Sequence, residues 1–371
     1  MGMKQTNLSD YGWSTLPQKE EKALQFLKQF PPENTAVSFS GGKDSLVALH
    51  LAKRAGISRA VFADTTMMAD EEIEYVKDIG EVLGVQVDIV RPKKTFWEFV
   101  EDFGTPSVRG RWCCAVLKYA PLSEYAKQYG IKYYITGLRR EESLIRRNYT
   151  KTSKNPMMPL TIEVNPILNW TKDEVWNYIH RYNLPVPPAY KKGLLRTGCL
   201  FCPFASPKFH KKLRELYPEE WAKFDEAVKN YALRVHATDI EQFVEKGWRV
   251  FRIPKKKTVV GWVGPDGELK MKEGFNREFK LLKILDPENP PKRYRQKVRI
   301  LVEKELNCVG CGACVALCPT DALFINESGK IDLHEEECAH CYQCTDTTLL
   351  KRACVARDFK LELFIVETRR G

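Results

Sequence analysis

The sequence has no apolar run close to the roughly 20 residues that a membrane-spanning helix needs. Its N-terminal residues also lack the basic and then apolar pattern of a secretory signal peptide. With 43% apolar and 29% charged residues among 371, the composition is that of an ordinary globular protein, long enough for two or three domains. We therefore expect a cytoplasmic protein that does not bind a membrane.

The chain has twelve cysteines, and each of them belongs to one of two groups, so no cysteine is left over. Reducing conditions in the cytosol argue against disulfides, and tight cysteine groups in such proteins are more often metal sites. The first group is Cys113, Cys114, Cys199 and Cys202. The second group is Cys308, Cys311, Cys314, Cys318, Cys338, Cys341, Cys344 and Cys354.

The second group begins with CVGCGACVALCP at 308–319, whose C-x2-C-x2-C-x3-C-P spacing is highly specific for two-cluster 4Fe–4S ferredoxins. In such domains each cluster takes three cysteines from one run and the last cysteine of the other. One predicted ligand set is Cys308, Cys311, Cys314 and Cys354, and the other is Cys338, Cys341, Cys344 and Cys318. Cys354 follows a longer gap than usual and has no proline after it, which makes it the least regular ligand.

The first group admits three interpretations. Four thiolates satisfy either a 4Fe–4S cluster or a tetrahedral zinc ion. Adjacent cysteines such as Cys113 and Cys114 are awkward for a zinc knuckle, which favours the cluster. Cys199 and Cys202 form a C-x-x-C pair that by itself would also suit a redox dithiol.

An anion-binding loop is predicted at SFSGGKDS, residues 38–45, which follows a predicted strand and opens a predicted helix. Two glycines let the backbone approach an anion, and a helix N-terminus offers unpaired N–H groups and a positive dipole end. The spacing is not that of a Walker loop. The predicted phosphate-binding residues are Ser40, Gly41, Gly42, Lys43, Asp44 and Ser45.

Alternating strand and helix patterns predict an α/β fold with a parallel sheet covered by helices on both faces. Strands are expected at 36–40, 58–64, 85–90 and 132–137, and helices at 20–30, 46–56, 70–83, 117–129, 171–183 and within 205–250. A small α+β ferredoxin domain should follow. The predicted divisions are 1–34 for a lead-in and helix, 35–248 for the nucleotide-binding domain, 249–298 for a basic adaptor and 299–371 for the ferredoxin domain.

Positive charge is concentrated near the adaptor. Residues 251–300 contain 14 Lys and Arg against 6 Asp and Glu, and the whole chain has a net charge of +11. Such a basic stretch attracts nucleic acid, phosphates or an acidic protein, although a solvated surface around a linker would have the same composition.

Six stretches together resemble the phosphoadenosine-phosphosulfate (PAPS) reductase family of the adenine-nucleotide α-hydrolase-like superfamily. They are SFSGGKDS, DTT at 64–66, RWCCAVLKYAPL, TGLRREES at 136–143, NPILNWTKDEVWNYI at 165–179 and GLLRTGCLFCP at 193–203. The resemblance implies that the loop holds the phosphates of an adenine nucleotide or adenylyl sulfate, and that the first cysteine group holds a third 4Fe–4S cluster. It also implies nucleotide-pocket roles for Asp64, Arg139, Arg140, Glu142 and Ser143, with Lys43, Arg139 and Arg140 as the candidate catalytic residues.

Two departures keep more than one function open. The family's reductases use a tail cysteine in a Glu-Cys-Gly-Leu-His motif, which this sequence lacks, so electrons from an external donor would pass through the fused ferredoxin domain. The intact SGGKDS is also found in ATP-using relatives, so an ATP-dependent sulfurtransferase that thiolates RNA or DNA is the alternative. A non-catalytic electron-transfer or nucleotide-sensing role is the third interpretation.

Overall fold

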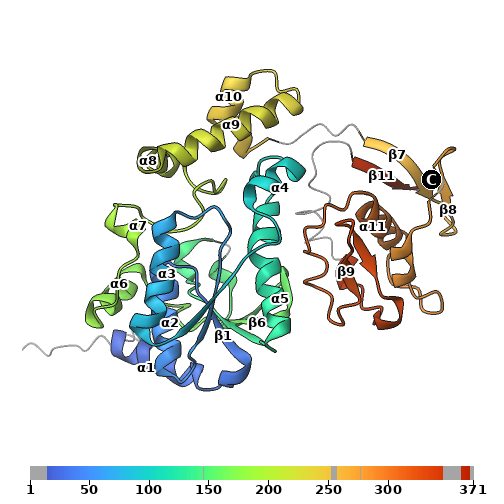
Figure 1. Cartoon of the computed structure of the whole chain (residues 1–371). Coiled ribbons are helices and arrows are strands. Elements are labelled where there is room, and N and C mark those ends of the chain that lie inside the picture. Colours follow the sequence, from blue (N-terminus) through green and yellow to red (C-terminus); the bar gives the residue numbers. More distant parts are fainter. Residues whose placement is uncertain (1–14, 145, 252–256, 276, 346–360, 368–371) are drawn as a thin grey trace, which may run out of the picture. The chain divides into compact units, whose positions relative to one another are not determined.

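The computed structural model describes residues 15–144, 146–251, 257–275, 277–345 and 361–367 (Figure 1). Cys354 and part of the basic stretch lie outside these residues. The chain forms two compact units. The first contains the residues up to Asp64 together with 68–90 and 125–199, and the second contains the rest.

A six-stranded sheet with the order β3-β2-β1-β4-β6-β5 forms the centre of the first unit. All neighbouring pairs are parallel except β5–β6, which is antiparallel. The predicted α/β class with a parallel sheet is therefore confirmed, and the antiparallel β5 at one edge is an addition that the sequence did not predict. The strands are β1 (Thr35–Ser38), β2 (Arg59–Ala63), β3 (Gln86–Val90), β4 (Tyr133–Ile135), β5 (Thr152–Asn155) and β6 (Met158–Val164).

Helices bury the apolar side chains of this sheet. Side chains from α1, α2, α3 and α6 join those of β1 and β2 in one hydrophobic core. The α3 helix has the predicted bounds and ends at Gly84, whose φ of 57° provides a left-handed C-cap. The helices that bear residues of the first unit are α1 (Leu16–Leu27), α2 (Lys43–Arg54), α3 (Asp70–Leu83), α5 (Ala120–Gln128), α6 (Lys172–Arg181) and α7 (Pro188–Lys191).

The second unit contains an aromatic helical part and a cysteine-rich part. Its helices are α4 (Phe96–Phe103), α8 (Pro207–Leu216), α9 (Pro218–Arg234), α10 (Ile240–Glu245) and α11 (Tyr294–Leu306). The sequence interpretation missed α4, although Thr95 and Glu98 form a capping box at its start. Large rings fill the space between α4 and α9, with Phe201 and Phe224 stacked at a centroid distance of 4.4 Å.

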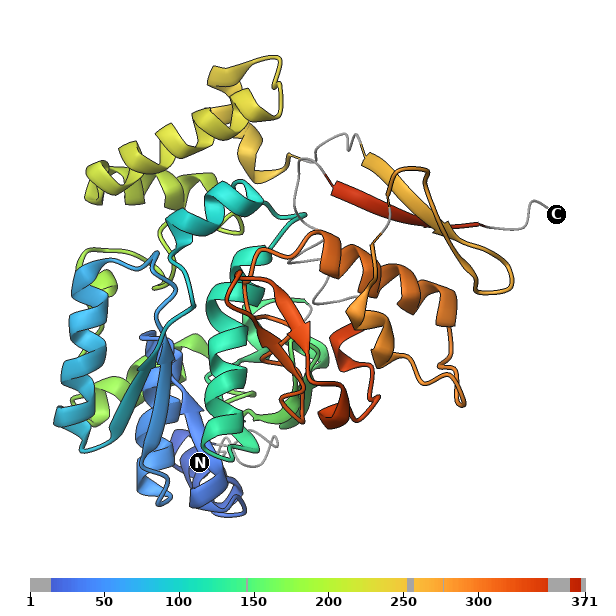
Figure 2. The same ribbon diagram turned by 45° about the vertical axis from the view of Figure 1, so that its right-hand side comes forward.

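Two small sheets complete the cysteine-rich part. They are the antiparallel pair β9 (Leu323–Ile325) and β10 (Ile331–Leu333), and a three-stranded sheet of β7 (Lys257–Val263), β8 (Leu269–Met271) and β11 (Leu361–Val366). In Figure 2, α11 is the orange helix beside the red hairpin. Side chains from α11, both sheets and four cysteines share one core. The predicted boundary at 298/299 lies inside α11, and the four-domain division stays a prediction.

No helix in the described ranges is both long and apolar enough to span a bilayer.

Candidate functional site

The predicted phosphate loop lies at the carboxyl edge of the parallel strands of the first unit. Strand β1 has β2 on one side and β4 on the other. Later strands are therefore added on both sides of β1, and the strand order changes direction there. Open α/β sheets bind ligands at such a switch point, outside the carboxyl ends of the strands. Residues 39–42 follow β1, Asp64 follows β2 and residues 136–139 follow β4, so the fold brings these predicted segments to one edge.

Hydrogen bonds inside the loop fix its shape. Gly41 has a φ of 73°, which favours glycine, and Gly42 is the N-cap of α2 but has no side chain to cap it. The Ser45 hydroxyl donates to the Gly42 carbonyl at 2.9 Å and accepts the Ser40 N–H at 3.2 Å. Because that hydroxyl has one proton, the Ser40 hydroxyl must donate to Ser45 across their 3.0 Å separation. The loop is thus held by its own side chains, while the first turn of α2 keeps the N–H groups that suit an anion.

Two cations converge on Asp44. The Lys43 ammonium pairs with one carboxylate oxygen of Asp44, and Arg139 Nε donates to the other at 2.6 Å. Arg139 is only 4% exposed, and it also donates to Glu141 at 2.6 Å and to the Trp170 carbonyl at 3.3 Å. The buried guanidinium therefore joins the segment after β4 to the phosphate loop and presents no exposed face to solvent.

Of the remaining predicted pocket residues, Arg140, Glu142 and Ser143 are exposed and Asp64 is buried. Arg140 donates to the Tyr149 carbonyl at 2.8 Å and to Asn169 at 2.9 Å, and its side chain is exposed. Glu142 pairs with Arg146 and also accepts the Arg139 N–H at 3.0 Å. The Ser143 hydroxyl accepts the Arg146 N–H at 3.3 Å. Asp64 is buried at 7% exposure. Their roles in binding stay predictions.

Four of the ferredoxin-type cysteines line one cavity of the second unit. They are Cys318, Cys338, Cys341 and Cys344, which is the set that the crossed ligand rule predicts for one cluster. Cys318 and Cys344 are buried, Cys338 is half-buried and Cys341 is exposed. Burial raises the pKa of Cys344 to about 11, so loading this site with metal must release protons.

The other run is more enclosed. Cys308, Cys311 and Cys314 are each 5–7% exposed. The Cys308 sulfur accepts backbone N–H groups from Gly310 at 3.4 Å and from Ile331 at 3.1 Å, which are bonds that a cluster thiolate would also accept. Gly310 has a φ of 68°, and a Cβ there would lie 2.5 Å from the Gly329 carbonyl. The donor set and these N–H groups fit a 4Fe–4S cluster, with the fourth predicted ligand, Cys354, outside the described residues.

No group of three or more His, Cys, Asp or Glu in the described ranges has the arrangement for a metal ion. That finding concerns sites for a single ion. A zinc site places its thiolates on one ion, whereas a 4Fe–4S cluster takes one thiolate at each of its four iron atoms.

The first cysteine group is divided between the two units. Cys199 belongs to the first unit, and the other three belong to the second. Cys113 is buried and Cys114 begins a π-helical segment, Cys114–Tyr119, a geometry that is frequent at functional sites. The Cys202 carbonyl accepts from His210 Nε2 at 2.9 Å. Whether the four hold a third cluster stays a prediction.

The comparisons with known proteins match both the part of the chain that contains the predicted phosphate loop and the part that contains the ferredoxin-type cysteines. The phosphoadenosine phosphosulfate reductase domain family matches residues 34–205, and the 4Fe-4S dicluster domain matches residues 307–347. An adenosine 5'-phosphosulfate reductase of Bacillus cereus is 31% identical over 167 residues, which are 44% of this chain and 70% of that protein. This chain belongs to the phosphoadenosine phosphosulfate reductase family.

Longer similarities extend beyond the reductase domain. An uncharacterized protein of Methanocaldococcus jannaschii is 33% identical over 244 residues, covering 64% of this chain and 58% of that protein. A second one is 30% identical over 239 residues and covers 62% and 49%, so the chain spans about half the length of these relatives. A crystal structure of a PAPS reductase from Candida auris covers 53% of this chain and 98% of its own, with 18% identity and a TM-score of 0.40.

In this member of the PAPS reductase family, several residues around the loop were missed by sequence reasoning. A Cβ on Gly137 would lie 2.5 Å from the backbone of both Asp44 and Ser45, so the segment after β4 can pass the start of α2 only as glycine. Tyr190 is half-buried, and its hydroxyl accepts the Lys43 N–H at 3.4 Å. The signals for Gly137 were its position at the end of a predicted strand and its place in the TGLRREES stretch at 136–143.

Glu72 is the other missed residue. Its side chain is 4% exposed, one oxygen accepts the Ala189 N–H at 2.7 Å, and Oε2 has no hydrogen-bond partner among the described residues. Burial raises its pKa. Oε2 would lie 4.0 Å from a Cβ built on Gly41, so this carboxyl group is close to the loop of the reductase domain.

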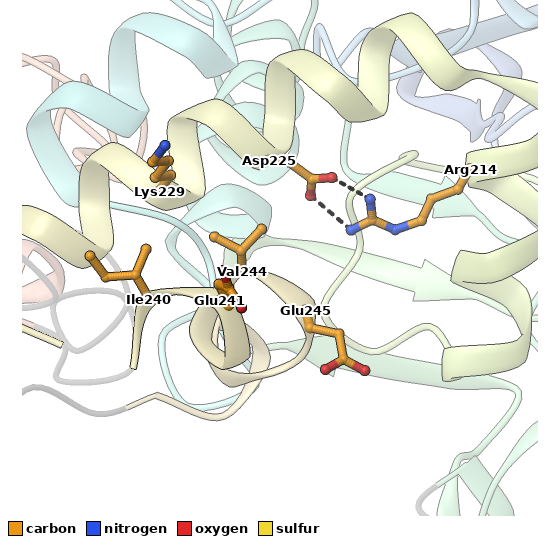
Figure 3. A pocket seen from close by; sticks show the side chains of 7 residues that line it. All are labelled: Arg214, Asp225, Lys229, Ile240, Glu241, Val244 and Glu245. Atoms are coloured by element: carbon orange, nitrogen blue, oxygen red, sulfur yellow. Dashed lines mark hydrogen bonds and ion pairs between the residues drawn. The ribbon is translucent and has the colours of Figure 1, made fainter. Parts of the chain in front are cut away.

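A separate surface pocket lies among α8, α9 and α10 (Figure 3). Arg214 and Asp225 form a two-bond ion pair across it, with one N–O distance of 2.8 Å. None of the predicted site residues lines it, and the charges that do are of both signs.

Among the described residues of the basic stretch, ion pairs with acidic side chains neutralise part of the positive charge. Lys280 pairs with Asp332 at 3.3 Å, and Lys283 pairs with Glu335 at 2.7 Å. A nucleic-acid partner for this stretch stays a prediction.

Proposed function

We propose that the chain is an iron–sulfur reductase that acts on an adenylyl sulfate, either adenosine 5'-phosphosulfate (APS) or its 3'-phosphorylated form, PAPS. The observation that carries this is the match of residues 34–205 to the phosphoadenosine phosphosulfate reductase domain, within which the loop at 40–45 opens α2 at the switch point of the sheet. The backbone N–H groups of the loop and Lys43 would hold the phosphates, as helix N-termini do for anions.

The reaction needs two electrons and one bond cleavage. The S–O bond to the bridging oxygen breaks, that oxygen stays with the phosphate as AMP (or as the 3'-phosphorylated product), and sulfur leaves as sulfite with the two electrons. Lys43 and Arg140 are the candidates to offset the negative charge on the bridging oxygen. Arg139 would act through Asp44 as a positioning residue, because its guanidinium is buried among protein acceptors.

The electron supply is the second part of the proposal. Every cysteine after Cys202 belongs to the ferredoxin runs, so the chain offers no further thiol in that region to attack the sulfate sulfur. The eight cysteines would instead hold two 4Fe–4S clusters, which supply one-electron transfer when bound. An external donor would reduce them, and the first cysteine group would hold a third.

A single-turnover experiment tests this proposal. Anaerobic protein is reduced with dithionite, freed of excess reductant and mixed with labelled APS or PAPS. We expect up to one sulfite and one nucleotide product per chain, with two electrons lost from the reduced protein. Lys43→Met should lower the product yield, whereas Lys211→Met, in α8 outside the candidate site, should not. No sulfite from either substrate in fully reduced protein would contradict the proposal.

The same preparation tests the alternative function. An ATP-dependent sulfurtransferase would convert ATP to AMP and pyrophosphate in the presence of an RNA or DNA acceptor, without releasing sulfite. The SGGKDS loop and the basic stretch favour this candidate. Pyrophosphate formation without sulfite release would contradict the reductase proposal and support the sulfurtransferase.

A further inference from the structure

In each ferredoxin-type cysteine run, the backbone carbonyl of one predicted ligand accepts a hydrogen bond from a lysine side chain. The Lys304 ammonium, from α11, donates to the Cys344 carbonyl. The Lys330 ammonium, from the hairpin between β9 and β10, donates to the Cys308 carbonyl at 2.5 Å. The two sites therefore have the same contact, one lysine to one cysteine carbonyl.

The two lysines differ in burial. Lys304 is 1% exposed and belongs to α11, whose apolar side chains share a core with Cys314, Cys318 and Cys344. Lys330 is exposed. The field of a charge is strong in a buried, low-dielectric region and is weakened by water and salt at the surface. The same formal charge should therefore act far more strongly on the site that contains Cys344.

The residues of that site fit a cluster. Cys318, Cys338, Cys341 and Cys344 line one cavity, and four thiolates are the donor set that a 4Fe–4S cluster takes. Adding an electron makes such a cluster more negative, and its reduction potential depends on nearby charge, hydrogen bonds to sulfur and exposure. A buried ammonium next to one ligand stabilises the reduced form more than the oxidised form.

We propose that the buried Lys304 ammonium raises the reduction potential of the cluster ligated by Cys344, whereas the exposed Lys330 has little effect on the cluster ligated by Cys308. The exposure of Cys341 and the N–H bonds to the Cys308 sulfur also influence the two potentials. These other contributions are the same in wild type and in a lysine variant, so each substitution isolates the charge. The inference rests on the proposed ferredoxin clusters but not on turnover of an adenylyl sulfate.

The test is an anaerobic redox titration of the full chain, followed by electron paramagnetic resonance. Lys304→Met removes the charge and keeps an unbranched apolar side chain. We expect the ratio of oxidised to reduced Cys344-type cluster at a fixed potential to rise about tenfold, a downward shift of about 59 mV for one electron. Cys341→Ser identifies the signal, because it changes a ligand of that cluster alone.

Two matched variants complete the experiment. Lys330→Met removes the exposed lysine and should change the corresponding ratio for the other cluster less than threefold, with a smaller change at high salt. Lys304→Arg keeps the charge and should stay near the wild-type potential. Iron and acid-labile sulfide are measured for every variant, so that loss of a cluster is distinguished from a shift.

Three results would overturn the proposal. One is an unchanged potential in Lys304→Met with iron and sulfide retained. Another is an equal shift in Lys304→Met and Lys330→Met, since burial would then not matter. The third is loss of the cluster in both Lys304→Met and Lys304→Arg, which would assign Lys304 to folding of this region. Sulfite release in the single-turnover experiment can succeed or fail independently of all three.

Discussion

Asp44 shows how single residues set the charge of the phosphate loop. Its two oxygens pair with the Lys43 ammonium and the Arg139 guanidinium, so one negative charge lies between two positive ones. The loop therefore has a moderate positive charge and a fixed geometry. An anion at the start of α2 would meet oriented N–H groups and one lysine whose position Asp44 restrains.

Replacing the buried arginine tests this arrangement. Arg139→Lys keeps a charge, but one ammonium nitrogen cannot take the places of both Arg139 Nε, which donates to Asp44, and Nη1, which donates to Glu141 and the Trp170 carbonyl. Since a hydrogen bond to a charged group contributes about 1.5–3 kcal/mol, we expect AMP or APS to bind about tenfold more weakly. Equilibrium dialysis with labelled nucleotide measures this.

Arg214→Lys is the matched control, because Arg214 pairs with Asp225 at the separate surface pocket and lies outside the candidate site. Its effect on nucleotide affinity should stay below threefold. Equal losses in the two variants would mean that Arg139 has no special role in supporting the loop.

At the level of elements, one carboxylate connects α1 to two other helices. Glu20 of α1 pairs with Arg54 of α2 and accepts from the Tyr182 hydroxyl at the end of α6. Burial by itself raises the pKa of Glu20, but the hydrogen bonds from Tyr182 and Arg54 lower that pKa by more, so the net shift is downward. The charged carboxylate therefore stabilises the docking of α1.

The sign of the pH dependence follows from this shift. A carboxyl group whose pKa is lowered in the folded chain contributes stability above its ordinary value of about 4.3, and the contribution is lost as the pH falls through the lowered pKa. At neutral pH, Glu20→Gln should make the amides of α1 exchange about tenfold faster than in wild type, which corresponds to about 1.4 kcal/mol. Near pH 3 the difference should shrink.

Hydrogen–deuterium exchange of α1 measures this effect, and Glu21→Gln provides the control. Glu21 is the exposed neighbour, and the one hydrogen bond that its side chain accepts from a described residue is a local one, from Gln25 at 3.2 Å. Similar exchange rates for the two variants at neutral pH would show that Glu20 does not hold the helix.

For the whole molecule, the metal content decides how many redox centres the chain contains. Twelve cysteines in three sets predict about twelve iron atoms and as many acid-labile sulfides per chain in anaerobic protein. About eight iron atoms with one zinc would make the first group a zinc site. Cys114→Ser should reduce the iron content by about four atoms if that group holds a cluster, whereas unchanged iron would exclude one there.

Several features of this protein could be predicted from short stretches of its sequence. The spacing of the ferredoxin cysteines identified a cluster-binding region because the ligands come from tight local runs, and the 4Fe-4S dicluster match confirms it. SGGKDS predicts an anion loop because a glycine turn before a helix creates such a site locally, and the structure places this turn at the start of α2, while anion binding stays a prediction. The class of the fold followed from alternating patterns, since each strand and helix has its own period.

The tertiary structure decided the features that depend on distant segments. The antiparallel β5 at the sheet edge, the support of Asp44 by Arg139 and the passage of Gly137 against α2 involve segments that meet only when the sheet has formed. The contrast between buried Lys304 and exposed Lys330 is of the same kind. Charge and residue type are written in the sequence, but burial, which determines how strongly a charge acts, is a property of the folded chain alone.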